Sequence, residues 1–400
     1  MKNNYQALIV GGGASGLTCA IELLRAKNCL SGSDVLILEK NDRVGKKLIA
    51  TGNGQGNLSN ANLSCSNYHG DKSFIDAVIN NPQKINVVNY LEELGVFLTT
   101  SSDGKIYPIS KQASAVLDIL REFLASKGCT VKTCENVVSI AKGKDDWIVK
   151  TQNGSYTAKN VVLAFGGAVG KQFGTDGSSY SLVQNLGYKV TKLYPSLVQL
   201  KTDTTFIRGL KGLKERARVI AYDGNVKLAE SVGDLLFTEF GVSGNAIFQV
   251  SSYLTDAKNP SISVEFLPDY TLEQVKNLLV KKSQIDYISK EEILVGILNK
   301  RIGQAILKRC NSFSPDVVAK QIKNFSLKVT GNLGFNYAQV TKGGVQTDQI
   351  NPLTMQSKIN KGLYVIGEAL DVDGDCGGYN LTFAFLTGIL SAINIKNNLK

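Results

Sequence analysis

Apolar runs separated by a glycine turn and a helical pattern open the chain. Residues 6–10 (Gln-Ala-Leu-Ile-Val) are almost wholly apolar, which is typical of a parallel strand buried on both faces. After the turn, Leu17 to Lys27 places apolar side chains at helical spacing, and residues 34–39 form a second apolar run. A strand, a turn, a helix and a strand within about 35 residues predict a βαβ unit.

Similar patterns continue to about residue 190. Apolar side chains recur at helical spacing in two segments, and β-branched runs indicate three more strands. The stretch 41–65 is rich in Gly, Asn and Ser and predicts an ordered loop. The predicted helices cover 73–94 and 113–127, and the predicted strands cover 136–140, 147–151 and 160–164.

The character of the chain changes beyond that point. Short alternating segments from Val198 to Phe266 predict an antiparallel or barrel-like unit. Residues 271–323 are predicted to be mostly helical. The chain then becomes glycine-rich again, and we expect a buried strand at 362–366 and a closing helix from about residue 380. One face of the helical part is expected to carry Ile293, Ile297, Leu298, Ile302 and Ile306.

The first turn carries the spacing Gly11-x-Gly13-x-x-Gly16, and Glu39 ends the second strand. Gly11 permits a tight turn, Gly13 lets the backbone approach a pyrophosphate, and Gly16 lets helix and strand pack closely. The helix N-terminus offers N–H groups to phosphates, and Glu39 can accept hydrogen bonds from ribose hydroxyls. A lone glycine motif also occurs as a purely structural turn. With strand, helix and distal carboxylate all in place, the sequence predicts dinucleotide binding.

Composition indicates a soluble globular protein, with 43% hydrophobic and 20% charged residues. No apolar run reaches the roughly 18 to 20 residues of a membrane span, and the first run breaks into glycines, so we expect no signal peptide. Seven cysteines without a C-x-x-C pair argue against a disulfide framework or a metal site. We therefore expect a cytoplasmic protein without a metal.

The net charge of +11 comes from 37 lysines and only eight arginines. Arginine is the preferred phosphate fork in nucleic-acid sites, so its scarcity weakens that interpretation. The densest basic stretch, Arg208 to Arg218, alternates with apolar residues like an ordinary strand. We expect a solvated lysine-rich surface rather than a nucleic-acid partner.

A single histidine, His69, lies in a polar segment where solvent exposure is expected. A redox enzyme without acid–base histidines leaves the difficult chemistry to its cofactor. Two further strands run into glycines, one ending in Gly166-Gly167 and one in Gly367-Glu368. Ordinary strand-ending turns give the same pattern. Together, and with one pair so far along the chain, they favour a long cofactor such as FAD across the sheet.

Three blocks of the sequence stand out as family motifs. They are Val44-Gly-Lys-Lys-Leu-Ile-Ala-Thr-Gly-Asn-Gly-Gln-Gly-Asn-Leu-Ser-Asn60, Gly233-Asp-Leu-Leu-Phe-Thr-Glu-Phe-Gly-Val-Ser-Gly244 and Gly367-Glu-Ala-Leu-Asp-Val-Asp-Gly-Asp-Cys-Gly-Gly-Tyr-Asn380. On these blocks the chain resembles one flavoprotein family over residues 5–390, the BaiN/RdsA-type NAD(P)/FAD-dependent oxidoreductases, which include aminoacetone-oxidase-like proteins.

This resemblance implies an α/β fold of the two-dinucleotide-binding-domain flavoprotein type. The Rossmann-like FAD-binding domain is expected to consist of residues 1–190 and 338–400. An insert over 191–337 interrupts it, β-barrel-like over 191–268 and helical over 269–326.

The resemblance also implies where FAD binds. Gly11 to Gly16 and Glu39 are expected to hold the ADP half, and Thr51 to Asn57 to lie along the flavin and its pyrophosphate. The last helix is expected to aim its N–H groups at the flavin N1/O2 edge, where reduced flavin carries negative charge. The expected cofactor-binding residues are Gly11, Gly13, Ala14, Ser15, Gly16, Glu39, Lys40, Lys47, Thr51, Gly52, Asn53, Gly54, Asn57, Leu58, Val137, Val138, Ala164, Gly166, Gly167, Gly367, Glu368, Gly377, Gly378, Tyr379 and Asn380.

One departure concerns the chemistry. The family shows an arginine and a cysteine where this chain has Gln55 and Gly56, and the glycine is expected to leave room for a bulkier substrate. The catalytic candidates are Gln55, Cys376 and Tyr379. Cys376 is either a low-pKa thiol or, as we favour, a small packed residue.

The expected function is a flavin-dependent oxidoreductase that transfers two electrons between a small organic substrate and FAD. NAD(P)H, oxygen or another acceptor or donor is the expected second partner. An amine or aminoketone oxidase that releases hydrogen peroxide is the alternative. A flavin-containing RNA-binding or RNA-modifying protein is the alternative from another class.

Overall fold

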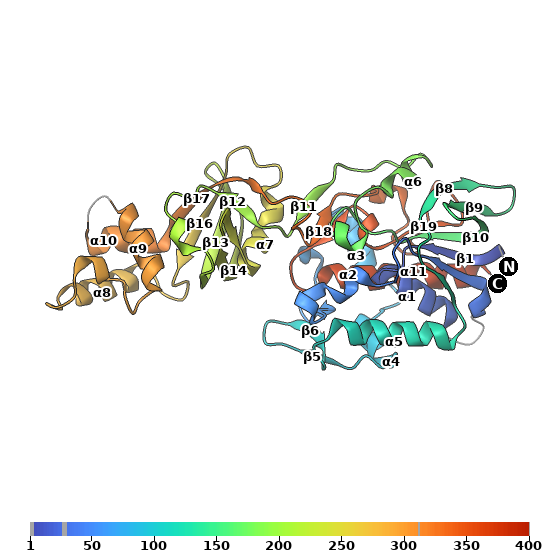
Figure 1. Cartoon of the computed structure of the whole chain (residues 1–400), viewed down its shortest axis with the longest axis horizontal. Coiled ribbons are helices and arrows are strands. Elements are labelled where there is room, and N and C mark those ends of the chain that lie inside the picture. Colours follow the sequence, from blue (N-terminus) through green and yellow to red (C-terminus); the bar gives the residue numbers. More distant parts are fainter. Residues whose placement is uncertain (1–3, 26–29, 311–312, 400) are drawn as a thin grey trace. The chain divides into compact units, whose positions relative to one another are not determined.

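The computed structural model describes residues 4–25, 30–310 and 313–399. The chain divides into two compact units (Figure 1). Unit 1 comprises Met1–Tyr194 and Val340–Lys400, and unit 2 comprises Pro195–Gln339. Unit 1 is therefore built from two segments that are far apart in the sequence.

A seven-stranded sheet forms the centre of unit 1. The largely buried β1 (Asn4–Val10) and the wholly buried β2 (Val35–Leu38) pair in parallel, as their apolar runs predict. On its other side β1 pairs in parallel with β10 (Ser155–Leu163), which pairs in parallel with β19 (Leu363–Val365). The remaining strands are β7 (Thr130–Lys132) beside β2, and the antiparallel β9 (Trp147–Thr151) and β8 (Val137–Lys142) beyond β10.

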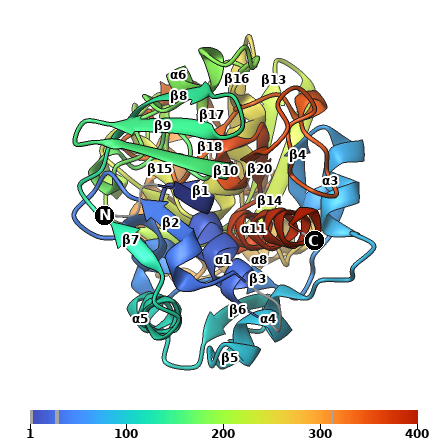
Figure 2. The same ribbon diagram turned by 90° about the vertical axis from the view of Figure 1, so that its right-hand side faces the viewer.

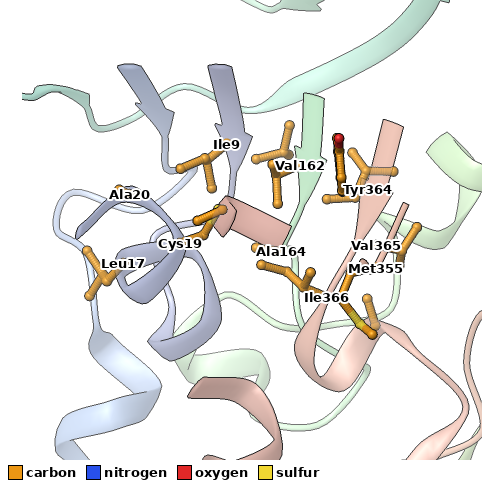
Figure 3. Packing of buried hydrophobic residues seen from close by; sticks show 14 of the residues in the cluster. Ile9, Leu17, Cys19, Ala20, Val162, Ala164, Met355, Tyr364, Val365 and Ile366 are labelled. Carbon is orange, nitrogen blue, oxygen red and sulfur yellow. The ribbon is translucent and has the colours of Figure 1, made fainter. Parts of the chain in front are cut away.

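Helices α1 (Ala14–Leu24) and α11 (Tyr379–Asn398) lie side by side against one face of this sheet (Figure 2). The two helices approach so closely that a Cβ at Gly388 of α11 would lie only 2.6 Å from the backbone oxygen of Ser15, so the contact requires a glycine there. Figure 3 shows Leu17 and Cys19 of α1 packed under the sheet together with Val162 and Ile366. The first and last parts of the described chain thus share one core.

Smaller elements complete unit 1. The helix expected over 73–94 is instead two helices, because the helical pattern is broken at Asn80–Asn86. Pro82 disfavours helical backbone at the residue before it, and Asn86 caps the next helix with its side chain. The elements are α2 (Lys46–Ile49), β3 (Ser59–Asn60), β4 (Tyr68–Gly70), α3 (Lys72–Ile79), α4 (Val87–Glu93), β5 (Leu98–Thr100), β6 (Lys105–Pro108), α5 (Ala113–Ser126), α6 (Tyr180–Gln184), β18 (Val340–Lys342) and β20 (Val372–Gly374).

Unit 2 is a closed six-stranded barrel with helices. Its inward side chains alternate along each strand, as Ala217, Val219 and Ala221 do on β13. The strands are β12 (Leu200–Thr202), β15 (Gly241–Ser243), β14 (Val226–Phe237), β13 (Lys214–Asp223), β16 (Pro260–Phe266) and β17 (Phe325–Asn332), and the helices are α7 (Asn245–Ser251), α8 (Leu272–Ser283), α9 (Lys300–Arg309) and α10 (Pro315–Lys323).

The predicted fold class is confirmed: a Rossmann-type domain with a barrel and helices in between. Two details of unit 2 were wrong. Of the five apolar residues expected on one helical face, only Ile302 and Ile306 lie on α9, and the others belong to the turns before it. Strand β17, which closes the barrel, was not predicted. Within the described ranges, no helix is long and apolar enough to cross a membrane.

Candidate functional site

The glycine turn between β1 and α1 is tightly packed at Gly11 and Gly16 but open at Gly13. Gly11 has φ +105°, and a Cβ there would lie 2.4 Å from the backbone oxygen of Ala164. A Cβ at Gly16 would lie 2.0 Å from the oxygen of Gly11. At Gly13 a Cβ would meet no described atom within 4 Å, and no side chain caps α1. The turn therefore fits a group that approaches the backbone and accepts from the first N–H groups of the helix.

Glu39 fixes the turn from the end of β2. Its Oε2 accepts from the N–H of Gly12 at 2.9 Å. Its Oε1 accepts from the N–H of Asn41 at 2.9 Å and from the Asn41 side-chain amide at 2.7 Å. Glu39 is only 7% exposed, so these bonds hold a buried carboxylate. Oε1 uses both of its lone pairs for Asn41, whereas Oε2 accepts only one bond, so Oε2 can still accept from a ribose hydroxyl.

The segment before β8 lies beside Glu39, because the N–H of Glu135 donates to the backbone oxygen of Glu39 at 2.9 Å. The pairing of β8 with β9 shifts register between Val137 and Ser139. Val138 is therefore bulged out, and it is 52% exposed. A bulge leaves main-chain groups unpaired, which suits a backbone contact to an adenine.

A second group of expected residues meets where β10 and β19 end. The ammonium group of Lys47 donates to Glu368 at 2.6 Å, and the other oxygen of Glu368 accepts from the N–H of Thr341 at 2.9 Å. A Cβ at Gly367, which has φ +67°, would lie 2.6 Å from Oγ of Ser15. The end of β19 therefore lies against the first turn of α1, although the two are far apart in the sequence.

The loop Thr51–Asn57 is strongly curved. Gly52, Asn53 and Gly54 all have left-handed backbone, with φ of 58°, 55° and 84°. The loop exposes residues 52–55, while Gly56 is buried with φ +76°.

The structure contradicts the expected role of Gly56 as room for a substrate. A Cβ there would lie 3.1 Å from Cα of Ala113, so the glycine serves close packing against α5. Gln55, in contrast, is exposed beside it.

The turn before α11 is braced from the loop and from β3. In the amide orientation that satisfies both partners, Asn57 accepts from the N–H of Gly378 at 3.2 Å. The side chain of Asn60 donates to the oxygen of Gly377 at 2.9 Å. Asn380 holds Gly374 through two bonds of 2.8 Å. The start of this 20-residue helix is thereby fixed next to the loop 51–57.

His69 was expected in solvent, and the structure corrects this. Its Nε2 lies 3.0 Å from a carboxylate oxygen of Asp375, and the two side chains are 19% and 9% exposed. Strand β4 pairs with β20, which brings His69 to the turn before α11. Sequence reasoning missed the pair because β4 is only three residues long and its partner lies about 300 residues away.

The remaining expected residues fall into three groups. Ala14, Ser15, Lys40, Ala164 and Gly166 lie around the glycine turn or the ends of β2 and β10. Gly167 lies beside Glu368, and Tyr379 is the first residue of α11. Leu58 is not at the surface of the site, since it is fully buried and its N–H donates to Ile106. Burial raises the pKa of the Cys376 thiol, which does not favour the low-pKa alternative.

These features fit FAD. The open backbone at Gly13, the uncapped α1 and the buried acceptor Glu39 suit an adenosine diphosphate, and the 51–57 loop with the start of α11 suits a ring beyond it. Among the described residues, no group of three or more His, Cys, Asp or Glu side chains is placed to hold a metal ion.

Comparison with known proteins agrees with a flavin-binding site. The chain is 34% identical to a 3-dehydro-bile acid delta(4,6)-reductase of Clostridium scindens, over 96% of this chain and 97% of that protein. It is 25% identical to a ribosomal RNA dihydrouridine synthase of Haemophilus influenzae, over 99% and 100% of the two chains. Among solved structures, a 3-ketosteroid-Δ4-(5α)-dehydrogenase of Rhodococcus jostii has the same fold, with a TM-score of 0.52, 15% identity and coverage of 98% and 97%.

The fold and these relatives define a flavin-dependent oxidoreductase of the FAD-binding Rossmann class. The signature of the HI0933-like protein Rossmann domain matches residues 5–394, so the chain belongs to the HI0933-like family, of the BaiN/RdsA type. The predicted family and the predicted enzyme class are both confirmed.

Proposed function

We propose that this protein is an FAD-dependent reductase of carbon–carbon double bonds conjugated to a carbonyl group in a small organic substrate. The observation that carries the proposal is the full-length 34% identity to a delta(4,6)-reductase of a 3-dehydro-bile acid. The more distant dihydrouridine synthases act on ribosomal RNA. Both names denote saturation of a carbon–carbon double bond, on chemically very different substrates.

We infer that FAD spans the two groups of residues described above. Its ADP half lies on Gly11 to Gly16 with its ribose at Glu39 and its adenine at the Val138 bulge. Its phosphates and ribityl chain pass Lys47 and Glu368. When bound, the flavin supplies a hydride to the substrate.

We further infer that the chain's own groups at the flavin ring are the loop 51–57 and the turn Gly377–Asn380. The first N–H groups of α11 stabilise negative charge at the N1/O2 edge, because a helix N-terminus carries partial positive charge. Lys47 adds a cation, but its ion pair with Glu368 at 2.6 Å offsets much of that charge.

We propose NAD(P)H as the electron donor. The test is anaerobic stopped-flow mixing with NADH and with NADPH, followed by conjugated cyclic ketones, including 3-keto steroids. Saturated ketones of the same size are the control. We expect flavin bleaching by one nucleotide and re-oxidation by conjugated ketones only. Re-oxidation by air alone, with peroxide formed from amines or aminoketones, would instead establish the oxidase alternative.

An RNA substrate is the second candidate, favoured by the names of the dihydrouridine synthases. Charge pairing on the barrel weighs against it. In the basic stretch, Lys214, Arg216 and Arg218 pair with Asp234, Asp269 and Glu265. A gel shift with ribosomal RNA at two salt concentrations tests it, since binding through phosphates weakens steeply with salt. Tight, salt-dependent binding would favour RNA over a small molecule.

A further inference from the structure

Strand β6 places two polar side chains beside the loop that we assign to the flavin. β6 pairs with β3, with Ile106 opposite Ser59 and Lys105 opposite Asn60. Because side chains alternate along a strand, Ile106 faces the buried side, and Lys105 and Tyr107 share the other.

Tyr107 lies directly against the loop. A Cβ at Gly52 would be 3.6 Å from Cε1 of the Tyr107 ring, which is ordinary van der Waals contact. The Tyr107 side chain is half-buried, and no hydrogen bond to another described residue engages its hydroxyl. A tyrosine hydroxyl at a partly enclosed site normally has a partner. This hydroxyl is therefore available to a bound molecule.

Lys105 brings a positive charge to the same place. Burial is the largest single effect and disfavours its charge, but the hydrogen bond to Asp103 and the nearby negative charges together outweigh burial and raise the pKa of the ammonium group. The ammonium group is therefore charged at neutral pH. That charge lowers the pKa of Tyr107, Cys376 and Tyr379 against the larger opposing effect of burial. The charge of Lys105 therefore acts on all three of these side chains, and Tyr379 is the first residue of α11.

We propose that Tyr107 is the proton donor in the double-bond reduction, with Lys105 as a positioning residue that stabilises the tyrosinate formed. This proposal rests on the proposed function. As the hydride from the cofactor forms a C–H bond at the carbon β to the carbonyl, the π bond breaks toward the carbonyl. The O–H bond of Tyr107 then breaks, and its proton forms the second C–H bond at the α carbon. The tyrosinate regains a proton from water, and reduced nicotinamide restores the electrons.

Two other groups near the start of α11 that could donate a proton, Tyr379 and His69, are less suited. The Tyr379 ring packs edge-on against Tyr68, with centroids 6.0 Å apart at 79°. His69 is held by Asp375. Burial raises the pKa of the Tyr107 hydroxyl, so it carries its proton at neutral pH. Of these three groups, Tyr107 is the one that contacts the loop at Gly52, and its hydroxyl is protonated at neutral pH.

The main test compares Tyr107→Phe, Tyr379→Phe and the wild type, with Tyr337→Phe, an exposed tyrosine of unit 2, as the matched control. Each holoenzyme is first reduced chemically without air and then mixed with a conjugated ketone. For Tyr107→Phe we expect re-oxidation to slow by about 10²- to 10⁴-fold, the usual contribution of a general acid, with FAD content and midpoint potential unchanged. In D₂O, deuterium at the α carbon should enter on one face in the wild type and on both faces in this variant.

A second measurement needs no cofactor. In 3-fluorotyrosine-labelled protein, the ¹⁹F signal that Tyr107→Phe removes identifies this residue, and its pH titration gives its pKa. Lys105→Met should move that titration to higher pH, because the tyrosinate loses its neighbouring cation. An unchanged titration would overturn the role of Lys105.

The outcomes separate the two proposals. If the wild type reduces no conjugated double bond, the proposed function fails, whatever the variants do. If the wild type reduces the ketone and Tyr107→Phe is as fast and as stereospecific, the assignment of Tyr107 fails while the function stands. A slow Tyr379→Phe beside a normal Tyr107→Phe would transfer the role to Tyr379.

Discussion

Replacing Glu39 by Gln tests whether this carboxylate holds a ribose or only the turn. The side chain keeps its size but exchanges one acceptor oxygen for an N–H donor. Its remaining oxygen can still accept both bonds from Asn41, which are 2.9 and 2.7 Å long. The new amide group then faces the N–H of Gly12, and two donors oppose each other at a contact that now measures 2.9 Å.

The cost has two parts. One buried N–H without an acceptor costs about 1–3 kcal/mol, and this part lowers the stability of the protein without FAD. The lost acceptor for the ribose hydroxyls costs a further 1–3 kcal/mol or so of binding free energy, since bonds to charged groups are the stronger ones. The second part corresponds to a rise in the FAD dissociation constant of about 5- to 150-fold.

The two parts are measured separately. Urea unfolding of the apoprotein gives the first, and titration with FAD, followed by quenching of flavin fluorescence, gives the second. Glu135→Gln is the matched control, because this carboxylate lies in the neighbouring segment and contacts Tyr156 rather than the turn. Wild-type FAD affinity in an apoprotein that has lost stability would refute the placement of the ribose at Glu39.

Four further predictions concern the same site. The cofactor extracted from the yellow protein should be FAD and not FMN, as chromatography can decide, because the glycine turn addresses an ADP moiety. Gly13→Ala should lower FAD retention but leave apoprotein unfolding within about 0.5 kcal/mol, whereas Gly11→Ala should destabilise it by 2 kcal/mol or more in urea titrations, roughly the cost of strain plus a clash. Gln55→Arg should raise the flavin midpoint potential without loss of FAD, and an unchanged potential would place this residue away from the ring. Gly56→Cys should destabilise the fold by about 1–3 kcal/mol in the same urea assay. A cysteine there would be strained by the positive φ, and its Cβ would press against Ala113.

The Rossmann half was predictable because its signals are local. Buried parallel strands are apolar throughout, and the spacing of Gly11, Gly13 and Gly16 is set by a turn of a few residues. The closing helix also stood out by its start, Gly377-Gly378. Where the signal was local but short, prediction failed. Pro82 divides a helical pattern into α3 and α4, and β17 lies almost wholly beyond the predicted helical region, in a stretch where no element was predicted.

The candidate site was only partly predictable, because its walls come from pairings between distant residues. His69 reaches Asp375 through two three-residue strands, and Tyr107 reaches the loop through the pairing of β3 with β6. No pattern within either segment records such a partner. At Gly56 the sequence was misleading in another way. The absence of a side chain suggested room for a substrate, but in the fold Ala113 occupies that space.

The pairing of β10 with β19 joins residues 161–163 to residues 363–365, and α11 then packs on α1. On the ribosome, the barrel unit has therefore left the exit tunnel before the Rossmann core can be completed. At about 5–20 residues per second, the apolar face of α1 waits roughly 20 to 70 seconds for its partner α11. During that interval the early βαβ unit exposes apolar surface and unpaired strand edges, which are prone to aggregation. In the placement proposed above, the FAD site is complete only after residues 367–380 have emerged.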